Sequence, residues 1–148
     1  MLVTTKGRYA MRMMVYIAGF PEGEKVALRH VSEAESISLK YLEQLAHSLV
    51  NAGLLTSVRG HGGGYILGKP AEEITAGEIL RAVEGTTVPV ACAALEEDGE
   101  CPRENICSTI SFWAGLDDVI ERYVDNVTLA ELSADDDGRT FGLEVADK

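Results

Sequence analysis

Three cysteines lie close together in the second half of the chain and carry its most reactive groups. Cys92, Cys101 and Cys107 follow the spacing C-x8-C-x5-C. Thiolates suit an iron–sulfur cluster or a zinc ion, and thiols can also act as a redox switch. Acidic neighbours such as Glu97 and Glu100 disfavour free thiolates, so a bound metal would be needed to keep the sulfurs deprotonated. From the residues alone, a metal site, a thiol switch and cysteines without a metal role all stay open.

A basic, glycine-rich turn near the middle of the chain suits a different partner. Arg59, Gly60 and His61 open the turn, three further glycines follow, and short β-forming runs flank it on both sides. Glycine lets the backbone come close to a ligand, and an arginine on such a turn can enter the minor groove of DNA. We expect Arg59 to make that contact and His61 to lie against the DNA backbone. The alternative is a hairpin turn without a binding role.

The segment directly before this turn predicts a helix with one apolar and one polar face. Leu42, Leu45 and Leu49 recur on one side, Ser38 is a suitable N-cap, and Gly53 follows the end. The polar side carries Ser38, Lys40, Tyr41, Glu43 and Gln44. Serine and glutamine can hydrogen-bond to base edges, lysine and tyrosine suit phosphates, and the glutamate can accept from cytosine N4 or repel wrong sequences. The alternative is a solvated helix face on which the tyrosine packs locally.

The order of the elements is that of a winged helix-turn-helix. Helical periodicity over residues 5–19 and 28–35 precedes the polar helix, and residues 36–38 form the turn. After the hairpin, the capping-box pattern that opens with Thr75 starts a helix that Gly85 ends. We therefore predict a mainly α-helical fold with a small β-wing, in which the polar helix enters the major groove of DNA.

A long helix with an apolar seam is predicted to begin at about residue 108. The seam residues recur at spacings of three and four and are Trp113, Leu116, Ile120, Tyr123 and Val127. Because this is a coiled-coil pattern, we expect the helix to join two copies of the chain. The predicted organisation is a DNA-binding domain (1–85), a cysteine-containing sensor loop (86–107), a dimerisation helix (108–133) and an acidic, disordered tail (134–148).

Charge is unevenly distributed along the 148 residues, whose net charge is -11. Residues 1–70 hold eight Lys/Arg against five acids, a net +3, whereas the rest holds five against nineteen, a net -14. DNA affinity depends on local cation placement, so the front half suits DNA. An apolar export segment, an apolar stretch of about 18 residues and a catalytic motif are all missing. We expect a cytoplasmic DNA-binding protein that is neither an enzyme nor membrane-bound.

Several short segments together resemble the Rrf-type bacterial transcription regulators, the group that includes IscR, NsrR and CymR. The matching segments are Thr5-Lys6-Gly7-Arg8-Tyr9-Ala10, Tyr41-Leu42-Glu43-Gln44-Leu45, Asn51-Ala52-Gly53-Leu54, Val58-Arg59-Gly60, Gly62-Gly63-Gly64-Tyr65 and Ile74-Thr75-Ala76-Gly77-Glu78-Ile79. The combination is specific, although no single segment is. The resemblance implies a homodimer in which a long C-terminal helix crosses the partner, with a winged helix at each end for double-stranded DNA.

The resemblance also favours an iron–sulfur cluster over zinc. Family members that sense through such clusters carry three cysteines just ahead of the dimerisation helix, as this chain does. The gap between Cys101 and Cys107 matches the IscR pattern, whereas the gap before Cys101 is longer. The histidine that follows in IscR is Ile110 here, and the NsrR-like N-terminal carboxylate is replaced by Arg8, so the fourth ligand is unassigned. A 2Fe–2S and a 4Fe–4S cluster both stay open.

These features predict a homodimeric repressor whose affinity for a DNA operator is set by the cluster. One alternative is a CymR-like regulator of cysteine metabolism that senses through thiol redox chemistry or a partner protein, without a cluster. A second is a redox or metal-handling protein whose winged helix makes protein contacts. Absent or salt-independent DNA binding would indicate the second, because phosphate contacts require a steep salt dependence.

Overall fold

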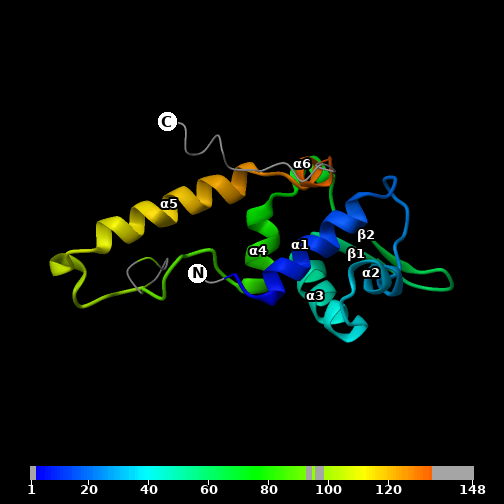
Figure 1. The fold of residues 1–148 in the computed structure, drawn as a ribbon, viewed down its shortest axis with the longest axis horizontal. Coiled ribbons are helices and arrows are strands. Elements are labelled where there is room, and N and C mark those ends of the chain that lie inside the picture. Colours follow the sequence, from blue (N-terminus) through cyan, green and yellow to red (C-terminus); the bar gives the residue numbers. More distant parts are fainter. Residues whose placement is uncertain (1–2, 93–94, 96–98, 135–148) are drawn as a thin grey trace.

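A computed structural model of the chain describes residues 3–92, 95 and 99–134. The described part is mainly helical with one two-stranded sheet (Figure 1). The elements in chain order are α1 (Thr5–Ala18), α2 (Leu28–Glu35), α3 (Leu39–Asn51), β1 (Leu55–Val58), β2 (Gly64–Leu67), η1 (Ala71–Glu73), α4 (Ala76–Glu84), η3 (Glu104–Ile106), α5 (Ile110–Asn126) and α6 (Leu129–Ala134). The predicted fold class, a helical protein with a small β-wing, is confirmed. None of the described helices is both long and apolar enough to cross a membrane.

The main core forms between α1 and α3. Thr4 caps α1, since its side-chain oxygen accepts a hydrogen bond from the Lys6 N–H at 3.2 Å. The buried apolar residues of α1 are Ala10, Met13, Met14 and Ile17. They share one cluster with Leu42, Leu45 and Leu49 of α3, each at most 3% exposed. This confirms the predicted inward face of α3, and its burial leaves the opposite face to solvent.

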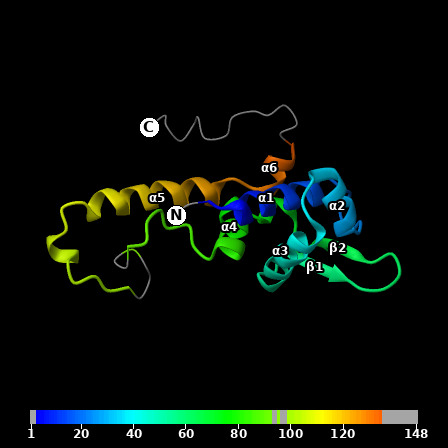
Figure 2. The same cartoon turned by 60° about the horizontal axis from the view of Figure 1, so that its bottom comes forward.

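Serine side chains fix the turn between α2 and α3. Ser36 has a left-handed backbone with φ 56°, and the Ser32 hydroxyl donates to the Ile37 carbonyl at 2.6 Å. The Ser38 hydroxyl then accepts from the Tyr41 N–H at 3.2 Å and so caps α3, which satisfies a helix-terminal donor. The predicted helix-turn-helix and its N-cap are confirmed. Figure 2 shows α3 and the hairpin on one side of the molecule, with α6 on the other.

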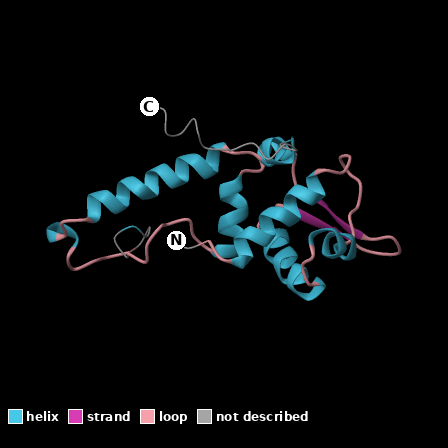
Figure 3. Ribbon diagram, viewed as in Figure 1, coloured by secondary structure: helices cyan, strands magenta, loops and turns pink. Residues whose placement is uncertain are grey.

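The wing is an antiparallel hairpin that is joined to the helical body along β2. The two strands lie side by side (Figure 3), and their register runs from Leu55 opposite Leu67 to Val58 opposite Gly64. On its other edge, Tyr65 of β2 exchanges two backbone hydrogen bonds of 2.9 Å with Val26, just before α2. The hairpin is therefore held between α3 and the start of α2, while residues 59–63 extend beyond the strands.

Helix α4 begins with the predicted capping box. The Thr75 hydroxyl accepts from the Glu78 N–H at 3.1 Å, and the Glu78 carboxylate accepts from the Thr75 N–H at 2.9 Å. The helix ends before Gly85, as expected. Its contacts with α1, α3 and α5 link the winged helix to α5, whereas α6 packs directly against α1 and η1.

The predicted dimerisation helix is divided into two helices. Helix α5 begins at Ile110 rather than at residue 108, ends at Asn126, and extends away from the winged helix in both Figure 1 and Figure 2. Thr128 caps α6 with its hydroxyl, which accepts from the Glu131 N–H at 3.2 Å. The two helices are separated at a β-bridge between Thr128 and Thr75, beside which the Ala76 N–H donates to the Val127 carbonyl at 2.8 Å. The segment 108–133 thus contains two helices, of which the second is the short one that Thr128 caps. The acidic tail predicted from residue 134 lies, apart from that residue, outside the described residues.

Candidate nucleic-acid interface and cysteine segment

The polar side of α3 is open to solvent. Lys40, Glu43 and Gln44 are exposed, and none of these side chains forms an ion pair in the part of the chain that the structure describes. Ser38 is exposed as well, with its oxygen engaged by the cap and its hydroxyl proton available. Tyr41 differs from the others, because it is half-buried and its ring meets the edge of the Tyr9 ring at 5.7 Å. The local packing considered for Tyr41 is therefore observed.

The wing turn presents Arg59, Gly60 and His61 at the surface. All three are exposed, and Gly60 has φ 104° while Gly62 has φ 74°. These backbone conformations disfavour residues other than glycine. The turn is closed by a 2.9 Å hydrogen bond from the Gly63 N–H to the Gly60 carbonyl. The glycine-rich sequence is thus needed for the shape of the turn that carries Arg59.

Lys40 and Arg59 are cations without a carboxylate partner among the described residues, whereas nearby Arg12 is occupied. The Arg12 guanidinium donates to the Glu35 carboxylate at 2.9 Å and to the Glu35 carbonyl, and it lies 5.4 Å from the centre of the Tyr9 ring. Arg12 therefore joins α1 to the end of α2, just ahead of the turn to α3. Lys40 and Arg59, by contrast, are available to bind an anionic ligand.

The three cysteines lie on irregular backbone between α4 and α5. Cys92, Cys101 and Cys107 are free thiols, each half-buried. Hydrogen bonds from the Thr109 side chain and backbone lower the pKa of Cys107, with a further contribution from Arg103. This favours the thiolate form, the form that binds metals.

The donor chemistry of this segment suits a metal, although the sulfurs do not converge. Among the described residues, no three Cys, His, Asp or Glu side chains lie close enough together to hold a metal ion. Among the residues of this segment that the structure describes, the backbone hydrogen bonds are local: Cys92 to Val90, Leu95 to Cys92, and Glu104 to Cys101. None of these bonds ties the segment to the winged helix.

Glu84, which the sequence did not identify as a site residue, is the last residue of α4 and connects the end of that helix to the start of α1. Its carboxylate accepts from the Gly7 N–H at 2.8 Å and from the hydroxyl and N–H of Thr4. Burial opposes the charge, but the hydrogen bonds from Thr4 and Gly7 prevail and lower the pKa of Glu84. A carboxylate at a helix C-terminus is unfavourable because it lies at the negative end of the helix dipole. This unfavourable position was the only feature of the sequence that could have pointed to Glu84.

The Glu84→Gln variant should lose stability in a pH-dependent way. A lowered folded-state pKa means that the carboxylate stabilises the protein above the ordinary value of 4.5, and that this stability is lost as the pH falls through the folded-state value. We expect the free energy of unfolding to fall by about 1 kcal/mol at neutral pH after allowance for solvent screening. At a pH below the folded-state pKa, the difference from wild type should be smaller. Thermal unfolding of both proteins at several pH values measures this. Glu33→Gln, at an exposed acid on α2, is the control; a difference between Glu84→Gln and wild type that does not shrink at low pH would contradict the assignment.

A bidentate ion pair joins α4 to α5. The Arg81 guanidinium donates to both carboxylate oxygens of Asp125 at 2.8–2.9 Å. Val124, which is 8% exposed, packs beside this pair against Ala76 and Leu80. This interface was not predicted, because the seam chosen from spacing leaves out Val124.

The seam residues of α5 have two different environments. Ile120, Tyr123 and Val127, expected at an interface between two chains, pack against α4 of their own chain. Trp113 and Leu116 lie further toward the start of α5, where Phe112 is 63% exposed and Val119 is 37% exposed. The C-terminal half of the predicted seam is thus used within the chain, and the apolar surface that stays open belongs to the N-terminal half.

Comparisons with known proteins agree with this architecture. A family model named Rrf2 and described as an iron-dependent transcriptional regulator matches residues 3–135. The HTH-type transcriptional regulator IscR of Yersinia pseudotuberculosis serotype O:1b is 41% identical over 148 residues, which is 100% of this chain and 86% of that protein. IscR of Escherichia coli O1:K1 is 42% identical over 132 residues, covering 89% of this chain and 80% of that protein.

Solved structures give the same result. CymR, the global cysteine regulator of B. subtilis, has a TM-score of 0.71 at 36% identity, covering 90% of this chain and 96% of that one. IscR of T. potens has a TM-score of 0.71 at 32% identity, covering 96% of this chain and 94% of that one. The relatives are transcriptional regulators and not enzymes. The family model and the relatives both extend over most of the chain, and the chain therefore belongs to the Rrf2 family of transcriptional regulators.

Proposed function

We propose that this chain is a homodimeric, sequence-specific DNA-binding repressor whose DNA affinity is set by an iron–sulfur cluster. The observation that carries DNA binding is the shared side of α3 and the wing, where Lys40 and Arg59 are exposed and have no carboxylate partner in the described part of the chain. A helix in the major groove and a basic hairpin along the phosphates or minor groove is the geometry by which winged helices bind. Binding to chromosomal DNA would place the protein in the cytoplasm.

The side chains on this surface have distinct roles in the proposal. Gln44 and the free hydroxyl proton of Ser38 read base edges in the major groove, while Glu43 accepts from cytosine or excludes other bases. Lys40 contacts phosphate, and Arg59 enters the minor groove, with Gly60 and His61 against the backbone. Tyr41 positions α3 through its ring, in contact with Tyr9, and so contributes to the interface indirectly.

Dimerisation is proposed through the N-terminal half of α5. Ile106 is 70% exposed and Phe112 is 63% exposed, and the Phe112 ring meets the edge of the Trp113 ring at 4.9 Å. Soluble monomers rarely expose a run of large apolar side chains on one projecting helix. A second copy that covers Phe112, Trp113, Leu116 and Val119 would also present two α3 helices to successive major grooves.

The proposed ligands of the cluster are Cys92, Cys101 and Cys107. The family description names iron, and the three free thiols lie on locally bonded backbone. A bound cluster would supply redox-active iron that three points of the segment share. Within the chain, this segment begins one residue after Glu84, which holds the start of α1, and ends at α5. A change in the segment therefore acts on both elements.

DNA binding is tested with a duplex selected from a random pool by the purified protein. The affinity should fall steeply as salt rises, because cations that contact phosphate release counterions. Arg59→Ala should weaken binding by about 1–3 kcal/mol, the value of a well-placed groove contact. Fluorescence anisotropy at several salt concentrations measures both effects.

The control is Arg122→Ala, at an exposed arginine of α5 that pairs with Asp118 at 2.8 Å. It removes the same charge at a distance from α3 and the wing, so its affinity should stay close to that of the wild type. Equal affinities for Arg59→Ala and wild type would contradict the role of the wing. Binding that is insensitive to salt would contradict DNA recognition as a whole.

A further inference from the structure

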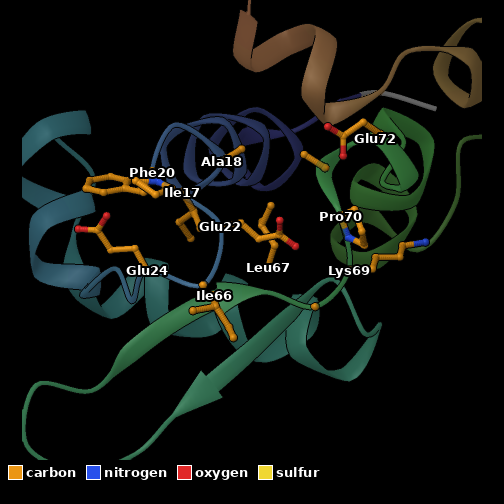
Figure 4. A pocket seen from close by; sticks show the side chains of 14 residues that line it. Ile17, Ala18, Phe20, Glu22, Glu24, Ile66, Leu67, Lys69, Pro70 and Glu72 are labelled. Atoms are coloured by element: carbon orange, nitrogen blue, oxygen red, sulfur yellow. The ribbon is translucent and has the colours of Figure 1, made fainter.

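A hollow of about 450 Å³ lies at the base of the wing, away from the turn that carries Arg59. It is bordered by the end of α1, the turn that follows, the end of β2, and η1, as Figure 4 shows. Its volume is in the range of small-molecule sites. The surface of α3 and the cysteine segment contribute no residue to it, so the proposed DNA contacts and cluster leave it unexplained.

The hollow has a mixed polar and apolar lining, and its apolar side chains are held in place. Ile17 is 3% exposed, and Phe20 meets the edge of the Tyr16 ring at 5.3 Å. Leu67 and Pro70 close the opposite side. Methylene groups that pack against such side chains leave water, and the favourable free energy of their burial grows with the apolar area removed from water. This apolar part of the lining therefore suits a short hydrocarbon chain.

The rim carries carboxylates from both sides. Glu22 and Glu24 come from the turn after α1, whereas Glu72 comes from η1 across the hollow (Figure 4). All three are exposed, and none of them forms an ion pair in the part of the chain that the structure describes. The lining cation, Lys69, is occupied by Glu78, with Nζ 2.7 Å from Oε1. The rim thus repels anions and attracts cations.

We propose that this hollow binds a linear aliphatic polyamine. Such a molecule carries ammonium groups separated by methylenes, so its charges can meet carboxylates on opposite sides while its chain covers the apolar wall. A lysine side chain offers one ammonium and satisfies one side only. A metal ion would gain nothing from Ile17, Phe20 and Leu67. A polyamine has separated charges for the carboxylates on the two sides and an apolar middle for the side chains between them. We therefore favour a polyamine over a lysine side chain or a metal ion.

The test measures spermidine binding to the full-length protein in the absence of DNA, by calorimetry and by NMR shifts of Phe20 and Leu67. Glu22→Gln/Glu72→Gln should weaken binding about tenfold, the effect of losing two exposed ion pairs. The matched control is Glu33→Gln/Glu73→Gln, which removes the same charge from two exposed acids outside the hollow. Its affinity should change little. Propylamine, with one ammonium, should bind much more weakly than spermidine.

Three results would overturn the proposal. Equal weakening in both double variants would show diffuse attraction to an acidic chain. Shifts of the same residues by Mg²⁺ at equal charge concentration would show that the apolar wall takes no part. A lysine-containing peptide that binds as tightly as spermidine would assign the hollow to a segment of a partner protein instead. Because DNA is absent, each result is independent of the proposed DNA recognition.

Discussion

Cys101→Ala is expected to abolish cluster binding and leave the fold intact. Removal of one of three thiolate ligands should cost more than the roughly 10–100-fold in metal affinity that loss of a second-shell partner costs. The fold should survive because Cys101 lies on irregular backbone, half-buried, and makes a local backbone bond to Glu104 that alanine retains. Iron and sulfide analysis and visible spectra of protein purified without oxygen measure the loss. Circular dichroism and sedimentation measure the fold and the oligomeric state.

Ser108→Ala is the matched control, since Ser108 is an exposed residue beside Cys107. It should keep the wild-type content of iron and sulfide. The spectrum of the wild-type protein would also separate a 2Fe–2S from a 4Fe–4S cluster. A colourless wild-type protein after anaerobic reconstitution, with DNA affinity unaffected by Cys101→Ala, would contradict the cluster.

That outcome would favour the alternative without a cluster, for which there is a structural reason. CymR of B. subtilis, a cysteine regulator by its name, has the same fold at 36% identity. The pKa of Cys107 is lowered by Thr109, so this thiol is also suited to redox chemistry. The two functions share the DNA-binding surface and differ only in what the cysteines bind, so the metal content separates them directly.

The parts of the fold that could be predicted are those encoded by neighbouring residues. Ser38 and Thr75 each cap a helix through a residue three positions later, and the leucines of α3 recur at the helical period. Such signals need no knowledge of the rest of the chain. The glycines of the wing turn are similar, because a positive φ at Gly60 and Gly62 is a local requirement. These elements are confirmed within a residue or two.

Features that depend on distant residues were not predicted. Glu84 bonds to Thr4 and Gly7, far away in sequence, and Arg81 bonds to Asp125 on another helix. The seam of α5 was chosen from spacing alone, which cannot distinguish contact with a second chain from contact with α4 of the same chain. The site residues on α3 and the wing stay predictions for a related reason: exposure is consistent with DNA contact but does not identify it.

Gly68→Ala is expected to destabilise the fold strongly, although it adds only one methyl group. A Cβ at this position would lie 2.1 Å from the Gly53 carbonyl oxygen and 2.9 Å from its carbon. Both are backbone atoms at the turn from α3 to β1, so no side chain can move aside. The strands must separate there, which would also break the 3.0 Å hydrogen bond from the Gly68 N–H to the Leu54 carbonyl. We expect a loss of about 3 kcal/mol, seen as a fall of roughly 10 °C in thermal midpoint.

The same substitution should impair DNA binding even where the protein is folded. The close approach of Gly68 to Gly53 sets the position of the hairpin relative to the end of α3, and thus of Arg59 relative to Gln44. DNA affinity measured well below the midpoint of the variant should therefore fall, although no residue of the interface is altered. Thr56→Ala, at an exposed position on β1, is the control and should change stability by no more than about 0.5 kcal/mol. Wild-type DNA affinity in folded Gly68→Ala would show that the wing and α3 bind DNA independently. That result would contradict the proposed interface, which requires the two elements to bind in a fixed relative position.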